Sequence, residues 1–131
     1  MGKETIICIV IVILIVVGEK FVHSYTIESI EELSNNLTQL KSEIFKNEEN
    51  IDMDYIKDEL SQIEEGWRQR HDKLAYFIEH DELEKVETDM TSMKSFIETQ
   101  EYNEAISELD KSIFVLKHIE DKYAFNLQNI F

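Results

Sequence analysis

The chain contains no proline and only three glycines in 131 residues, and after residue 22 the single glycine is Gly66. Tight turns between strands depend on glycine and proline, so a sheet of short hairpins is not expected. Long helices are the structure that this composition favours. The single cysteine also excludes a disulfide scaffold, and the length allows one domain plus an extra segment.

Apolar residues recur every three or four positions over most of the chain, which is typical of helices that bury one face. These apolar stripes run from Ile30 to Ile44, Met53 to Phe77, Leu83 to Ile97 and Tyr102 to Leu116. We predict an all-α fold, in which an N-terminal membrane helix or signal segment is followed by an antiparallel bundle of three to four helices. The predicted helices cover residues 26–47, 52–79, 81–98 and 102–124.

Polar segments separate the stripes and suggest where helices begin. Asp52 or Asp54 is a candidate N-cap for the second helix, and Asp81-x-x-Glu84 resembles a capping box. An alternative keeps residues 46–54 helical, which would fuse the first two helices into one rod. A homodimer that shares a stripe would show the same pattern, because the spacing does not name the partner.

Ile6 to Val17 is an unbroken apolar run. It would form roughly 18 Å of helix, short of the roughly 30 Å hydrocarbon core, as in a cleaved signal peptide. A helix that continues to Val22 reaches roughly 26 Å and just spans the membrane if Glu19 and Lys20 lie at the interface. Both interpretations stay open at this point.

The positive amino-terminal flank suggests an orientation. If Lys3 and the α-amino group stay in the cytoplasm, the rest of the chain lies outside it. We therefore divide the chain into a signal-anchor or single transmembrane segment, residues 1–22, and an acidic extracytoplasmic bundle, residues 23–131. The expected location is the cell membrane, with a secreted protein as the result if the first segment is cleaved.

The net charge of −15 belongs entirely to residues 23–131, because Lys3 and Lys20 offset Glu4 and Glu19. Phosphates would repel so acidic a domain, so nucleic acid is not an expected partner. The charge is typical of a well-solvated surface.

Four residues stand out in this acidic part: Trp67, Arg68, Arg70 and His71. They include both arginines and the only tryptophan. Such a patch could contact an anion or a protein partner, since guanidinium groups pair well with carboxylates and phosphates. Alternatively, Arg70 pairs with an acidic residue of a facing helix, while its stem and the tryptophan ring pack into the bundle.

The C-terminus ends on apolar residues where most chains end in a polar tail. Something is expected to cover them, either the protein's own bundle or a groove of a partner. The candidate docking tail consists of Phe125, Leu127, Ile130 and Phe131.

Catalytic and metal-binding patterns are missing from the sequence. It has no G-x-S-x-G turn, no glycine-rich phosphate loop and no Glu-x-x-His pair, and Cys8 lies inside the apolar run. His80 has acidic neighbours, but it falls at a predicted turn where helix capping explains them. We expect no enzyme activity, no metal and no cofactor.

Three motifs and the short apolar N-terminus resemble an uncharacterised bacterial family, domain-of-unknown-function family 4363. The motifs are Trp67-x-x-x-x-x-x-Leu74-Ala75, the segment from Phe77 to Leu83, and the segment from Phe125 to Phe131. The resemblance implies a small Gram-positive protein with one membrane segment and a helical extracytoplasmic part, often encoded beside a multi-pass membrane protein. It implies no functional residues.

The expected function is a membrane-tethered, extracytoplasmic protein-interaction module, accessory to an integral membrane protein. The alternative is a small-ligand or metal-binding sensor bundle outside the membrane. The residues that would serve the sensor are Arg68, Arg70, His71 and His80.

Overall fold

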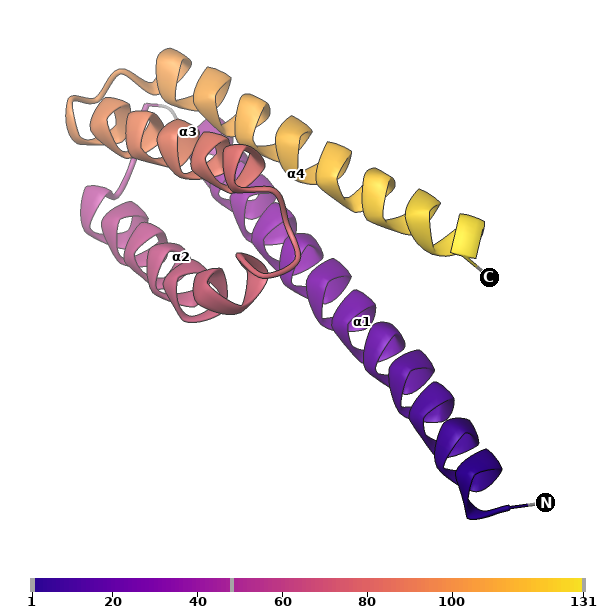
Figure 1. Cartoon of the computed structure of the whole chain (residues 1–131). Helices are drawn as coiled ribbons and strands as arrows, with labels where there is room; N and C mark the ends of the chain where they lie inside the picture. The colour runs from indigo at the N-terminus through magenta and orange to yellow at the C-terminus, as the bar shows by residue number, and fades with distance from the viewer. Residues whose placement is uncertain (1, 48, 131) are drawn as a thin grey trace.

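A computed structural model describes residues 2–47 and 49–130, with side chains to residue 125. Its four helices are α1 (Lys3–Lys46), α2 (Met53–Leu74), α3 (His80–Glu98) and α4 (Tyr102–Ile130). Consecutive helices run antiparallel, and the N-terminal half of α1 projects alone beyond the bundle (Figure 1). The described residues include no strand, so the predicted all-α bundle with a leading apolar helix is confirmed.

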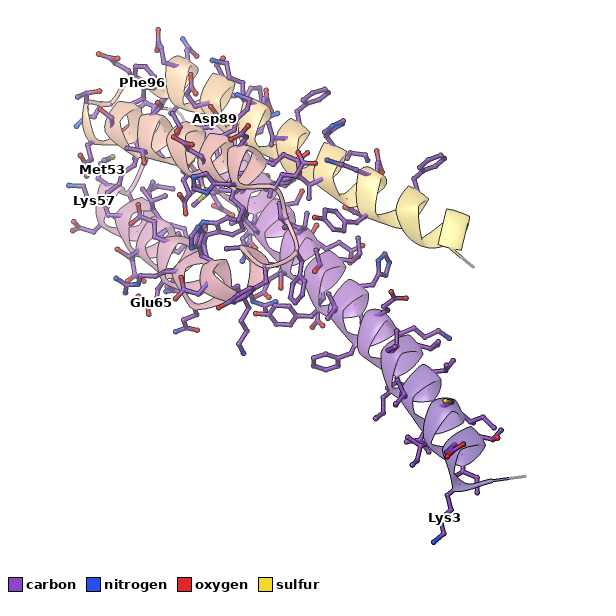
Figure 2. The ribbon with its side chains drawn as sticks, in the orientation of Figure 1. Lys3, Met53, Lys57, Glu65, Asp89 and Phe96 are labelled. Atoms are coloured by element: carbon purple, nitrogen blue, oxygen red, sulfur yellow. The ribbon has the colours of Figure 1, made fainter. Side chains whose placement is uncertain are left out.

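Helix α1 is longer than the sequence predicts, because the apolar run and the first bundle helix are one continuous helix of 44 residues. One glycine inside a helix costs about 1 kcal/mol, and Gly18 does not break the hydrogen-bonded ladder. The N-terminal side chains project on all sides without packing, as Figure 2 shows around Lys3. From Thr26 onward the same helix buries one stripe in the bundle.

The alternative of one fused rod is wrong, since α1 ends at Lys46 and α2 begins at Met53. Asp52, one of the two predicted candidates, is the N-cap of α2. Its carboxylate accepts hydrogen bonds from the backbone N–H groups of Asp54 and Tyr55 at 3.1 and 3.2 Å. These bonds satisfy donors that a helix start otherwise leaves free.

The second turn begins earlier than predicted, because α2 ends at Leu74 and not at residue 79. The backbone N–H groups of Phe77 and Ile78 both donate to the Leu74 carbonyl, at 2.9 and 2.8 Å, which closes the turn. Ile78 is buried and the Tyr123 hydroxyl donates to the Phe77 carbonyl, so packing against α4 fixes this turn.

The capping box predicted at Asp81-x-x-Glu84 is wrong. Helix α3 starts one residue earlier, at His80, and its N-cap residue Glu79 makes no side-chain cap. Asp81 lies in the first turn instead, where its negative charge faces the positive end of the helix dipole.

The predicted stripes of α1, α2 and α3 supply most of the core. In α4 the buried face is rotated from the predicted one: Tyr102, Ile106 and Ile113 are only partly buried, while Ala105 and Ser112 are fully buried. Small side chains at these two positions allow close helix packing, and the apolar pattern alone does not show this. The buried apolar residues of α4 are Ala105, Leu109, Val115, Leu116 and Ile119.

The turn between α3 and α4 contains Gln100, whose φ is 61°. Among the residues that the structure describes, no other non-glycine residue has a positive φ. The Glu101 N–H donates to the Phe96 carbonyl at 2.8 Å and the Gln100 N–H donates to the Ile97 carbonyl at 3.1 Å. This pair of bonds is a Schellman motif, in which the left-handed position favours glycine.

Replacing Gln100 with glycine should therefore raise the free energy of unfolding by about 1 kcal/mol, because glycine adopts this conformation without strain. Urea denaturation of the two proteins measures the difference. The matched control is Gln39→Gly in the middle of α1, which should lower stability by about 1 kcal/mol. A Gln100→Gly variant that is less stable than wild type would contradict the assignment of the turn.

A second prediction concerns α1 and α4, where Glu31 and Glu120 face each other. Burial raises the pKa of Glu120 above its ordinary value of 4.5, and the Glu31 carboxyl raises it further. The folded state thus holds this proton more tightly than the unfolded chain. The resulting stabilisation is present below pH 4.5 and is lost as pH rises through the folded pKa.

Glu120→Gln should accordingly increase stability at pH 7, and the gain should disappear in acid, where both forms are neutral. Thermal melts followed by circular dichroism across this pH range provide the measurement. Glu49→Gln, in the exposed α1–α2 turn, should change stability little at either pH. A destabilised Glu120→Gln variant at pH 7 would refute the prediction.

Candidate functional site

Trp67 and His71 lie one turn apart on α2, and both contact the same residue of α3. The Trp67 indole N–H donates to Glu87 Oε1 at 3.3 Å, and His71 Nε2 lies 3.0 Å from the same oxygen. The tryptophan ring is buried, with the imidazole edge-on at 6.2 Å between ring centroids. Glu87 is therefore the residue that links α2 to α3 beside the candidate patch.

Arg70 points to the other neighbour of α2, helix α1. Its guanidinium donates to Ser29 Oγ at 2.8 Å, forms an ion pair with Glu32, and lies 5.8 Å from the centroid of the Tyr25 ring. These are the contacts expected from the alternative in which Arg70 pairs within the bundle. The arginine joins α1 to α2 through both terminal nitrogens of its guanidinium.

Arg68 differs from Arg70, because 78% of its side chain is exposed and it pairs only with Glu65 on its own helix. It lies on the edge of a groove between α2 and α3. Glu65, labelled on α2 in Figure 2, belongs to the same edge. The charged and large apolar residues that line this groove are Glu64, Glu65, Trp67, Arg68, Glu87 and Met90.

The charges of this groove favour a cationic ligand over an anion. Three carboxylates line it, and its cations are the Arg68 guanidinium and the Lys94 ammonium, which pairs with Glu64 at 3.1 Å, while the second arginine points away toward α1. Trp67 and Met90 also line the groove, but both are buried, with 7% and 5% of their surface exposed. A surface of this kind suits a peptide segment that carries basic residues.

The four residues suggested for a sensor do not form one site. Arg68, Arg70 and His71 pair with Glu65, Glu32 and Glu87 respectively, on three different helices. His80 lies at the start of α3, largely exposed, with Glu84 at 3.8 Å. Among the described residues no group of three or more His, Cys, Asp or Glu side chains could hold a metal ion.

The C-terminal tail is only partly described. The Phe125 side chain is 62% exposed, and α4 continues to Ile130. The side chains of Leu127, Ile130 and Phe131, which complete the predicted docking tail, lie outside the described residues.

Comparison with known proteins identifies the family. The model of a domain of unknown function, DUF4363, matches residues 21–130, so the chain belongs to this family. No curated protein and no solved structure matches the chain. The family match covers the whole bundle and begins just after the apolar run.

Sequence reasoning missed the acidic partners of the patch, Glu87 and Glu32. Glu87 lies four residues after Leu83 and Glu32 lies beside Leu33, so both flank apolar stripes. Position beside a stripe is the only signal that distinguishes them from the other acidic residues.

Arg70→Leu should lower the free energy of unfolding by about 1 kcal/mol, since it removes the hydrogen bond to Ser29 together with the ion pair to Glu32. Arg68→Leu is the matched control and should change stability by less than about 0.5 kcal/mol, because its pair is exposed. Chemical denaturation of both variants gives the values. An Arg70→Leu variant as stable as wild type would show that these contacts do not hold α2 on α1.

Proposed function

We propose that the protein is a single-pass membrane protein whose acidic bundle stands outside the cytoplasm and binds another protein. The groove between α2 and α3 carries the proposal. It is lined by carboxylates beside the buried Trp67 and Met90 side chains, and it is open to solvent. Its charge complements a basic segment of a partner.

The membrane tether is supported by α1, the one described helix that is long and apolar enough to cross a membrane. A signal sequence passes the same test of length and composition. The continuity of α1 favours retention of the N-terminal segment. The apolar run that a signal peptidase would remove and the segment that forms the core belong to the same helix. Cleavage near residue 18 would leave the bundle without this connection.

The short distance that the bundle can extend from the membrane supports a partner that is itself in the membrane. Residues 23–46 of α1 form roughly 36 Å of helix, and α2 and α4 pack against α1. No interruption in α1 gives the bundle a hinge within this helix. A partner must come to the membrane surface, as the exposed part of an integral membrane protein does.

Binding is a better fit to this groove than catalysis. Each charged group that an enzyme would use is already paired: Glu87 with His71, Glu64 with Lys94 at 3.1 Å, and Arg68 with Glu65. Groups held in such pairs favour recognition by shape and charge. We therefore propose an accessory role without enzyme activity, metal or cofactor.

The test is affinity capture of the full chain from detergent extracts of the native membrane. The double variant Glu64→Lys, Glu65→Lys reverses the groove's charge and should abolish recovery of an integral membrane partner. Asp121→Lys, on the exposed face of α4, changes the charge elsewhere and should recover the partner normally. Melting curves of all three proteins check that the fold is kept.

Equal recovery by wild type and the groove variant would contradict this site. A chain truncated after Tyr123 keeps the contact of Tyr123 with the α2–α3 turn and separates the groove from the docking tail, because loss of the partner in that variant alone would assign binding to the tail. Capture of only a second copy of the chain would show a homodimer in place of an integral membrane partner.

A further inference from the structure

Aromatic side chains gather at the end of the bundle nearest the apolar half of α1. Phe21 and Tyr25 of α1 and Tyr76 and Phe77 of the α2–α3 turn line one hollow, together with Val22 and Lys73. Phe21 is 72% exposed and Tyr76 is 84% exposed. The rings of Tyr76 and Phe77 lie 6.4 Å apart, so the turn presents them as a pair. We call these four residues the aromatic cluster.

The position of the cluster along α1 is set by the fold. A helix from Ile6 to Val22 is roughly 26 Å long and spans the hydrocarbon core with Glu19 and Lys20 at the interface, so the outer boundary lies near residues 19–22. Phe21 lies at that boundary and Tyr25 lies one turn beyond it. Because α2 runs antiparallel to α1, the turn that follows α2 places Tyr76 and Phe77 beside Phe21 and Tyr25.

The short apolar run strengthens this placement. Ile6 to Val17 forms only roughly 18 Å of helix, and a stretch shorter than the bilayer draws its flanking residues into the interface. Aromatic rings are the side chains that prefer this layer, and tyrosine keeps its hydroxyl in the polar region. The burial of Phe21 and Tyr76 in lipid would remove apolar area that the isolated chain leaves in water.

The charges around the cluster also suit a lipid surface. Lys73 Nζ lies 5.7 Å from the centroid of the Tyr25 ring, and the Arg70 guanidinium lies at 5.8 Å. Arg70 pairs with Glu32, so Lys73 is the cation that this end of a strongly acidic chain offers to a lipid surface. An ammonium beside aromatic rings matches the phosphate groups above the acyl chains.

We propose that the aromatic cluster inserts into the outer interfacial layer of the bilayer that α1 crosses. The bundle then has two membrane contacts, the span and the α2–α3 turn, and the second fixes its rotation about α1. This inference rests on the membrane tether of the proposed function, but it does not depend on the partner groove.

Fluorescence quenching by brominated phosphatidylcholine tests the insertion in the full chain reconstituted into vesicles. Buried Trp67 gives the baseline signal in the wild type. Tyr76→Trp adds a second indole in the cluster, where high exposure of Tyr76 makes the change harmless to the fold. Phe45→Trp is the matched control, because Phe45 is also exposed, at 67%, but lies at the opposite end of the bundle. Val12→Trp reports on the span itself.

We expect lipids brominated near the glycerol to quench the added emission of Tyr76→Trp and to leave that of Phe45→Trp unchanged. Strong quenching of Val12→Trp with none for Tyr76→Trp would overturn the insertion while the tether stands, and would leave the cluster to a protein partner. If lipids brominated deep in the acyl chains left Val12→Trp unquenched, that would instead contradict the tether, and the insertion with it.

Discussion

The whole structure depends on the continuity of α1. One helix is apolar on every side over its first half and apolar along a single stripe over its second half, with no break between them. The second half supplies the stripe from Ile30 to Ile44 against which α2 and α4 pack. Any environment that holds the first half therefore also sets the position and orientation of the bundle.

Much of this fold follows from the sequence, because its stripes are long and uninterrupted by proline. The element type and the antiparallel order came from local patterns, which also narrowed the cap of α2 to Asp52 or Asp54. The rotated face of α4 did not, since Ala105 and Ser112 are buried for their small size, and neither is large and apolar like the residues that mark the predicted stripe. The end of α2 also escaped prediction, because a tertiary contact of Tyr123 with the turn decides it.

The candidate site was less predictable than the fold. Composition singled out Trp67 and the two arginines, but which of many acidic residues they meet depends on how the helices are rotated. Arg70 faces α1 and His71 faces α3, so a patch that is continuous in sequence is divided between two interfaces. The aromatic cluster could not be found from sequence, since its parts meet only because α2 returns along α1.

The central claim is that α1 stays whole, as both anchor and core helix. Mass spectrometry of the protein recovered from the membrane fraction tests it most directly. An uncleaved anchor predicts the mass of the full chain, 15.5 kDa, with or without Met1. A product that begins after Gly18 or Ser24 would contradict it, because the bundle would then have been separated from its membrane segment.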